Sequence, residues 1–259
     1  MENREALLSA LEWYVDAGVT IPVENDPNNR FSRTLDIPDS LTSTKIAPSE
    51  PPQKTQATAS ADIIKQAQAA ADACSTLDEL RAAILAFDAH PLKKLATNMV
   101  FGDGNPQADI MVIGDPPATD EDRSGQAFCG VDGQLLDKIL VSIGLSRDTV
   151  YLTHIINWRP PGNRTPLTEE IAISLPFIQK HIELVSPKHV VLMGGIAGKS
   201  ILKATETMSR MRGKFHEYGD KKTPTLTTYT PSFLIANPLQ KRKVWQDMLA
   251  LKDKIDAIS

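Results

Sequence analysis

Two segments near the middle of the chain carry residues that could bind or react with a charged ligand. Residues 114–130, GDPPATDEDRSGQAFCG, combine four acidic side chains with an isolated aromatic residue, Phe128. A loop of this length in a compact domain is usually functional. Residues 158–166, WRPPGNRTP, contain three prolines and two arginines. The prolines make the loop rigid and the arginines can bind phosphates, so the loop could hold a phosphate backbone in a fixed position. The simpler alternatives are a solvated acidic loop anchored by Phe128 and a proline-rich cap on a strand.

Two other groups of residues give weaker signals. The turn Gly194-Gly195-x-x-Gly198 could cradle a phosphate at the start of a helix. It lacks the full dinucleotide spacing and the lysine of a P-loop, so we interpret it as an ordinary exit from a strand. Three histidines have a spacing that matches no zinc site, and we assign them no role because single histidines are more often structural; they are His181, His189 and His216.

Strands that alternate with helices position these loops. Buried strand patterns occur at 109–114, 150–157 and 189–193, with a weaker one at 225–229, and helical patterns occur at 133–143, 168–185, 196–204 and 239–256. Such alternation implies βαβ crossovers. We therefore predict an α/β fold with three layers, αβα, around a central, mostly parallel four-stranded sheet. Sites in such folds lie at the carboxyl ends of the strands, which points to loops 114–130, 157–166, 194–198 and 230–238.

The first sixty residues differ in character from the rest. Residues 1–19 have the pattern of a short amphipathic helix, and residues 20–60 are rich in Pro, Ser and Thr. The latter composition predicts a disordered linker, with a loop packed on the core as the alternative. The folded domain is then 61–259. Its first helices are expected at 61–73 and directly after Thr76, which with Glu79 has the spacing of a capping box.

The composition is that of a globular protein, with 41% hydrophobic and 23% charged residues. No run of 18 apolar residues occurs, which argues against a membrane span, and the acidic N-terminus is unlike a signal peptide. The two cysteines, Cys74 and Cys129, fit a reducing compartment. The net charge of −4 arises within residues 1–55, so the remainder is neutral and charge alone does not decide whether DNA binds. We expect a cytoplasmic monomer.

Three segments resemble the family 4-type uracil-DNA glycosylases. GDGNPQADIMVIGDPPATDEDRSGQAFCGVDGQLLDKIL is similar to the family's first motif region, in which GEAPG is followed by EDxxGxPFVGxxGxLL. WRPPGNRTP is similar to the second block. TPSFLIANPLQKRKVWQD is similar to the third, an HPSYLLRNP-type stretch before a basic helix, and MRGKF at 211–215 also matches. The resemblance covers residues from about 86 to 255, in the family's order and spacing.

The resemblance implies an enzyme that flips a deoxyuridine out of DNA, stacks the base on an aromatic ring and hydrolyses its N-glycosidic bond. Asp115 takes the position of the glutamate of GEAPG, and Thr230 that of the HPS histidine. His154 takes the position of the asparagine that reads the uracil edge. The implied base pocket contains Gly114, Pro116 and the stacking ring of Phe128. The implied DNA contacts are Arg159, Asn163, Arg164, Ser232, Leu234, Lys241 and Arg242, with Leu234 and Ile235 as candidates for an apolar wedge.

The chain departs from the family's pattern at three pocket positions. An imidazole at His154 cannot copy the donor–acceptor pair of an amide. The Thr230 hydroxyl is shorter than a histidine and always neutral, so it is a poorer partner for developing negative charge. Ala236 takes the position of an arginine, and the change removes a phosphate contact that the resemblance implies. Two basic stretches, 210–222 and 241–243, could still face DNA, or could be ordinary solvated surface.

Members of the family with an iron–sulfur cluster hold it through four cysteines. The matching positions here are Phe87, His90, Trp158 and Ser174. Since four thiolates are the normal requirement, we predict no cluster, no metal site and no other cofactor. Apolar packing around Phe87 and Trp158 is expected to fill the space.

Three hypotheses stay open at the level of sequence. The chain is a working glycosylase with His154 as a substitute reader, or a non-catalytic relative that still binds DNA, or a glycosylase for another deaminated base such as hypoxanthine. The first is supported by the surviving acid and aromatic ring, and the other two by the changed pocket residues.

Overall fold

The structure of the protein is a computed structural model that describes residues 54–257, with side chains described from residue 61. The predicted helix at 1–19 and most of the predicted linker lie outside the described residues. The helix α2 (Lys54–Asp72) begins inside the expected linker, earlier than residue 61, where we placed the start of the domain. The other elements, in chain order, are α3 (Leu77–Ala86), β1 (Asp103–Gly104), β2 (Ile110–Gly114), α4 (Thr119–Ser124), α5 (Gly130–Val141), η2 (Arg147–Thr149), β3 (Val150–His154), η3 (Pro161–Asn163), α6 (Thr168–Val185), β4 (His189–Met193), α7 (Gly195–Leu202), α8 (Met208–Met211), β5 (Phe215–Tyr218), β6 (Thr223–Thr228), α9 (Pro231–Ala236), η4 (Pro238–Gln240) and α10 (Lys241–Asp256).

The sheet contains the four predicted strands and two more. Its order is β1-β3-β2-β4-β6-β5. The four strands β3, β2, β4 and β6 are parallel to one another, as predicted. The short strands β1 and β5 pair antiparallel to β3 and β6 at the two edges, so the sheet is mixed and six-stranded rather than four-stranded.

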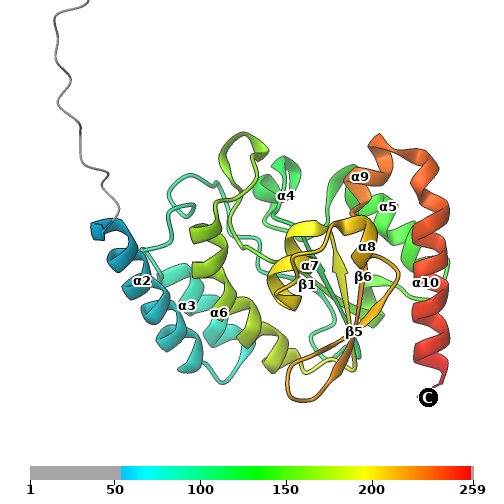
Figure 1. Cartoon of the computed structure of the whole chain (residues 1–259), viewed down its shortest axis with the longest axis horizontal. Helices are drawn as coiled ribbons and strands as arrows, with labels where there is room; N and C mark the ends of the chain where they lie inside the picture. The colour runs from blue at the N-terminus through cyan, green and yellow to red at the C-terminus, as the bar shows by residue number, and fades with distance from the viewer. Residues whose placement is uncertain (1–53, 258–259) are drawn as a thin grey trace, which may run out of the picture. The chain divides into compact units, whose positions relative to one another are not determined.

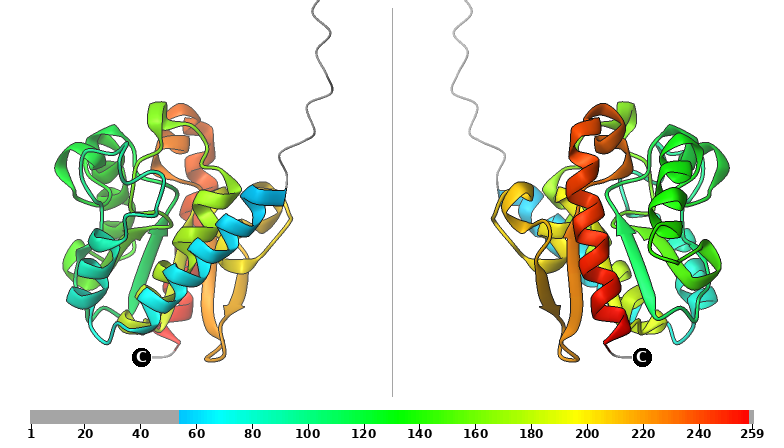
Figure 2. Two further views of the ribbon diagram at one scale, coloured as in Figure 1. Left: turned by 90° about the vertical axis from the view of Figure 1, so that its left-hand side faces the viewer. Right: turned by 90° about the vertical axis from the view of Figure 1, so that its right-hand side faces the viewer.

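Helices cover both faces of the sheet, which confirms the predicted three layers. In Figures 1 and 2, α2, α3 and α6 lie on one side of the strands, and α5, α9 and α10 lie on the other. Alternate residues of β2, β3 and β4 enter the two cores. Met111 of β2 packs with the first helix group and Val112 with the second. Such strands read as continuous apolar runs because both faces are buried.

The start of α3 lies where the capping residues in the sequence predict it. The Thr76 hydroxyl accepts a hydrogen bond from the Glu79 N–H, and the Glu79 carboxylate accepts one from the N–H of Ser75. The predicted start of α3 is therefore confirmed. Within residues 54–257, no helix is long and apolar enough to cross a membrane.

The register of the parallel strands brings their carboxyl ends to one edge. Gly114 at the end of β2 lies opposite both His154 of β3 and Met193 of β4, and Met193 lies opposite Thr228 of β6. The loops that leave these residues are those in which the sequence predicts the site. They therefore surround a common space.

Candidate active site

A cavity of about 300 Å³ opens at the carboxyl ends of the central strands. It is lined by the loop after β2, the end of β3, the proline-rich loop before α6, the start of α7 and the start of α9. The residues from the predicted site that line it are Asp115, Pro116, Phe128, His154, Asn163, Arg164, Thr230 and Ser232.

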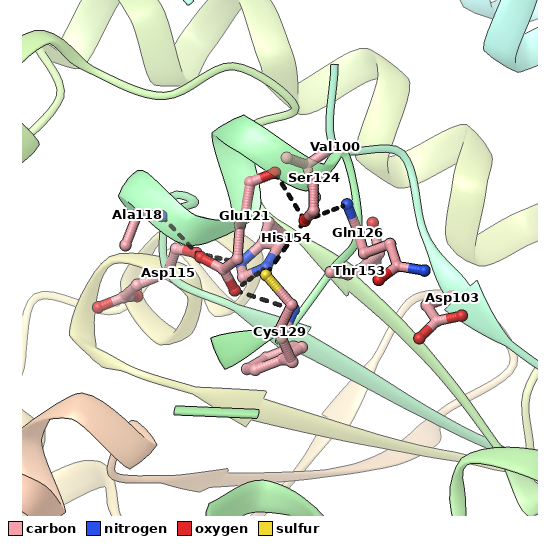
Figure 3. Close-up of polar contacts among 12 residues, drawn as sticks. Val100, Asp103, Asp115, Ala118, Glu121, Ser124, Gln126, Cys129, Thr153 and His154 are labelled. Atoms are coloured by element: carbon pink, nitrogen blue, oxygen red, sulfur yellow. Dashed lines mark hydrogen bonds and ion pairs between the residues drawn. The ribbon is translucent and has the colours of Figure 1, made fainter. Parts of the chain in front are cut away.

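Asp115 is the acidic group of this cavity. One carboxylate oxygen, Oδ1, accepts hydrogen bonds from the N–H groups of Ile196 (2.9 Å) and Ala197 (2.8 Å) in the first turn of α7. Burial raises the pKa of Asp115 to about 6, against the opposing effects of these N–H groups and of His154. In Figure 3 the carboxylate points away from the His154 ring. Asp115 is therefore a held carboxylate that is ionised at neutral pH.

The turn Gly194-Gly195 serves to receive this carboxylate. Gly194 has φ +120°, and a Cβ there would collide with the Asp115 carboxyl group. Because the helix start already binds a carboxylate, the alternative that it cradles a phosphate is not supported. Gly194-Gly195 is therefore a turn that leaves β4, as we interpreted it, and it also holds the Asp115 carboxylate.

Phe128 is fixed from its backbone. Its N–H donates to Oε1 of Glu121 (2.9 Å), and the Arg147 guanidinium donates to its carbonyl oxygen. Its backbone is in the left-handed region, with φ +51°. Its ring stacks against the His154 ring, with 4.6 Å between centroids and 24° between planes. The ring that we expected to stack a base therefore already has one aromatic neighbour.

His154 ends β3 and is 3% exposed. Its Nδ1 lies 2.5 Å from the backbone carbonyl oxygen of Asp115, and its Nε2 lies 3.0 Å from Oε1 of Glu121. The second contact is an ion pair whose direction falls short of a good hydrogen bond. Gly114 makes room for this arrangement: a Cβ there would be 2.6 Å from the Phe128 ring and 2.8 Å from Nδ1 of His154.

Glu121 is a site residue that from sequence is only one acid of the loop 114–130. It is 5% exposed and joins three parts of the site, because its carboxylate also accepts a hydrogen bond from the N–H of Ala118 (2.6 Å). Figure 3 shows the carboxylate between Ala118 and the His154 ring. The available signal was the family motif EDxxG, of which Glu121 is the first residue, although the motif does not indicate its partner.

Thr230 and Ser232 stand at the start of α9. The Thr230 hydroxyl accepts a hydrogen bond from the N–H of Phe233 (3.2 Å), which caps the helix, and lies 3.0 Å from the Ser232 hydroxyl. Both residues line the cavity, as expected. Thr230 therefore combines a structural capping role with access to the site.

The proline-rich loop is braced by internal bonds. Arg159 donates to the side-chain oxygen of Asn163 (2.6 Å). Arg164 binds the buried Glu170 with both terminal nitrogens, at 2.9 Å and 2.6 Å. Glu170 also caps α6 through the N–H of Leu167 (2.7 Å). These arginines shape the loop, so any contact they make with DNA is additional to that role.

Three residues of the predicted DNA face that lie on α9 and α10 do not line this cavity. Leu234 is 1% exposed and belongs to the core beneath α9, so the prediction that it contacts DNA is corrected. Helical geometry turns its neighbours outward instead: Phe233 is 38% exposed and Ile235 is 43% exposed. Lys241 and Arg242 are exposed at the start of α10, but they border a separate apolar groove beside Trp245.

The positions that correspond to the cluster cysteines form a packed region without thiols. His90 and Ser174 are buried and bonded to each other, with Nε2 and Oγ 2.9 Å apart. Trp158 lies in the apolar core, and Phe87 packs edge-to-face on Phe177. These side chains do not fit a cluster that requires four thiolates. In the part of the chain that the structure describes, no three His, Cys, Asp or Glu side chains are placed to hold a metal ion.

The match to known proteins covers the elements that build the cavity. A model of the uracil DNA glycosylase superfamily matches residues 101–249, which include the loop after β2, the end of β3 and the start of α9. The chain belongs to the uracil DNA glycosylase superfamily. Superfamily membership confirms the predicted family resemblance and the fold that it implied.

Individual members of the superfamily are also similar to this chain in sequence. The chain is 33% identical over 178 residues to a type-4 uracil-DNA glycosylase of Archaeoglobus fulgidus, which is 66% of this chain and 89% of the relative. It is 30% identical over 185 residues to a type-4 uracil-DNA glycosylase of Sulfurisphaera tokodaii, covering 69% and 84% of the two chains. A type-5 uracil-DNA glycosylase of Pyrobaculum aerophilum is 34% identical over 115 residues, or 39% of this chain and 50% of the relative.

Proposed function

We propose that this protein is a DNA repair glycosylase that removes uracil, or a related deaminated base, from DNA by base flipping and hydrolysis of the N-glycosidic bond. The observation that carries the proposal is a cavity in which a held carboxylate, Asp115, lies near an aromatic pair, Phe128 and His154. The names of the relatives point the same way.

The Asp115 carboxylate is suited to the charge that such a reaction develops. Cleavage of the glycosidic bond leaves positive charge on the sugar, and a preorganised carboxylate stabilises it or orients a water molecule toward it. The N–H groups of α7 fix the carboxylate, so it needs little reorganisation during the reaction. Its pKa of about 6 keeps it ionised at pH 7.5.

The other pocket residues would bind and orient the nucleotide. Thr230 and Ser232 contribute two hydroxyl groups to the cavity lining, where they can donate to the base or the phosphate. Beside them, Phe233 and Ile235 are exposed apolar side chains that suit a wedge between base pairs. Lys241 and Arg242 add positive charge for the DNA backbone.

Abasic-site formation in uracil-containing oligonucleotides tests the proposal. We expect single- and double-stranded substrates to yield alkali-labile product with the wild type, and Asp115→Ala to lose at least a hundredfold in rate. Asp120→Asn is the matched control, because Asp120 is an exposed carboxylate of the same loop. If the wild type binds DNA in a salt-sensitive manner but forms no abasic product, the enzymatic proposal is overturned in favour of a non-catalytic relative.

We further propose that the protein works without an iron–sulfur cluster and as a monomer. The hydrogen bond between His90 and Ser174 and the packing of Phe87 and Trp158 support a fold that needs no iron. Iron analysis and absorption near 400 nm test the first point, and about four iron atoms per chain would refute it. Sedimentation at micromolar concentration tests the second, for which a mass of 28.3 kDa is expected.

A further inference from the structure

Both ring nitrogens of His154 face oxygen atoms of the protein. Nδ1 lies 2.5 Å from the carbonyl oxygen of Asp115, and Nε2 lies 3.0 Å from Oε1 of Glu121. A neutral imidazole has one N–H group, so either tautomer would point a lone pair at one of these oxygens. The side chains of His154 and Glu121 are only 3% and 7% exposed, so bulk water does not separate the unfavourable pair. The arrangement is most favourable when the ring carries both protons, because Nδ1–H then donates to the Asp115 carbonyl oxygen and the positive ring forms an ion pair with Glu121.

Glu121 is built to hold this imidazolium. Its own carboxylate is fixed by the N–H groups of Ala118 and Phe128, which keep it in place whether or not the histidine is charged. Burial raises the pKa of Glu121, but His154 and these N–H groups outweigh burial and lower it. Burial lowers the pKa of His154, but Glu121 and the Asp115 carbonyl outweigh it and raise it. The lowered pKa of Glu121 and the raised pKa of His154 are both those expected of an ion pair between a carboxylate and an imidazolium.

The charged surroundings of the ring favour the same state. Glu121 faces it from α4, and the Asp115 carboxylate adds negative charge from the loop after β2. Asp132 on α5 lies near Glu121 and adds to the negative potential around the pair. The ring also packs on the face of Phe128, whose electron-rich surface attracts a cation.

We propose that Glu121 is a positioning residue that holds His154 as an imidazolium against Phe128, so that the imidazolium backs the Phe128 ring as the stacking wall of the base cavity and does not read the edge of the base. The proposal rests on the proposed function, because it concerns the base that such an enzyme would accept. It replaces our expectation that His154 acts as a substitute reader, since both ring nitrogens already face oxygen atoms of the protein.

A wall that only stacks on the base and an amide that hydrogen-bonds to its edge differ in how strongly they discriminate between bases. A site built to hydrogen-bond a substrate rejects an analogue without the matching groups by roughly 10⁴-fold or more. Stacking tolerates any base, because every base has a π face. We therefore expect uracil and hypoxanthine to be released at rates within about tenfold of each other. Replacing His154 by the amide of the family pattern should restore a preference for uracil.

Single-turnover release from single-stranded oligonucleotides that carry uracil, hypoxanthine or xanthine tests the specificity. We expect His154→Asn to raise the uracil-to-hypoxanthine rate ratio at least tenfold over the wild type. His154→Phe keeps a stacking ring without charge or N–H groups and should leave this ratio within about threefold of the wild-type value. A wild-type preference for uracil above about a thousandfold that His154→Asn does not change would overturn the proposal.

Nitrogen NMR of the histidine side chains tests the pair without any turnover. At pH 7.5 we expect both ring nitrogens of His154 to be protonated in the wild type, and the ring to become neutral at this pH in Glu121→Gln. Asp120→Asn should leave the His154 signals unchanged. A neutral His154 ring in folded wild-type protein at pH 6 would refute the imidazolium. If no base is released but the imidazolium is observed, the proposed function fails while the role of Glu121 in holding the ring is supported.

Discussion

Asp115 contacts His154 through its backbone and not through its carboxylate. The Nδ1–H group of His154 donates to the carbonyl oxygen of Asp115, while the carboxylate turns to the N–H groups of α7. One residue thus fixes the orientation of the histidine ring and presents a negative charge to the cavity. A substitution that changes only the carboxylate should therefore leave the histidine in place, which allows the two roles to be separated.

The first prediction concerns the pH dependence of base release. Burial raises the pKa of Asp115 to about 6, so its ionised form is lost as the pH falls through 6. We expect the single-turnover rate of uracil release to rise between pH 5 and 7 with a midpoint near 6, and to level off above pH 7. Asp115→Asn should lower the plateau by about 10²- to 10³-fold and remove this rise.

Asp115→Glu separates charge from length at the same position. It restores the glutamate of the family motif, and we expect it to retain at least a tenth of wild-type activity. A rate profile of the wild type that stays flat between pH 5 and 7 would contradict the assignment of Asp115 as the essential carboxylate.

The second prediction concerns stability against pH. The folded-state pKa of His154 lies above the unfolded value of about 6.5. Its ionisation therefore contributes stability that is fully present below about pH 6.5 and is lost as the pH rises through the folded-state pKa. We expect the difference in unfolding free energy between the wild type and His154→Phe to shrink as the pH rises above 7, measured by urea denaturation.

His189→Phe is the control for that measurement. Burial lowers the pKa of His189, so its contribution changes only below about pH 6.5. The corresponding difference for this variant should stay constant from pH 7 to 9. A constant difference for His154→Phe over the same range would argue against the charged pair with Glu121.

The third prediction concerns the attachment of α10 to the sheet. Asp247 of α10 is 2% exposed, pairs with the Arg212 guanidinium and accepts a hydrogen bond from the Thr228 hydroxyl (2.7 Å). Arg212 belongs to a basic stretch that we considered for DNA binding, but its charge is committed to this pair. Asp247→Ala leaves a partly buried cation without its partner and should destabilise the protein by roughly 3–5 kcal/mol.

Thr228→Val provides the matched comparison, because it removes one hydrogen bond and keeps the charges. We expect a loss of about 1 kcal/mol. Equal losses for the two variants in denaturant titrations would show that the ion pair contributes little.

The sequence predicts the central sheet well because the four inner strands are buried on both faces, and a continuous apolar run such as Ile110–Ile113 is a strong signal. It does not predict β1 or β5. The strand Asp103–Gly104 has only two residues, and Phe215–Tyr218 is half-buried at the edge of the sheet. Both depend on pairing with a partner strand that local sequence does not specify.

The site shows the same division between local and tertiary information. The motif resemblance brings together the cavity residues Asp115, Phe128 and Thr230. It does not reveal that His154 forms an ion pair with Glu121, because these residues are far apart in the chain and meet only when β3 pairs with β2. Similarly, apolar residues at the start of α9 do not reveal from sequence that Leu234 faces the core and Ile235 faces out.

The last prediction concerns the DNA-binding surface. Lys241 and Arg242 are exposed at the start of α10, and within residues 54–257 neither takes part in a salt bridge, whereas Arg164 is bound to Glu170. Each freely solvated cation that contacts a phosphate contributes about one unit to the slope of log affinity against log salt. We therefore expect the double variant Lys241→Ala/Arg242→Ala to reduce this slope by up to about 2, measured by fluorescence anisotropy with a labelled oligonucleotide.

Two further variants complete that measurement. Arg164→Ala should mainly lower the free energy of unfolding and have little effect on the salt slope, because its guanidinium braces the loop before α6. Lys188→Ala is the control, since Lys188 pairs with Asp109 at the opposite ends of the strands. Should the double variant bind with an unchanged slope while Lys188→Ala reduces it, the DNA would have to lie on the other edge of the sheet, away from the cavity, and the orientation proposed for the α9–α10 surface would be wrong.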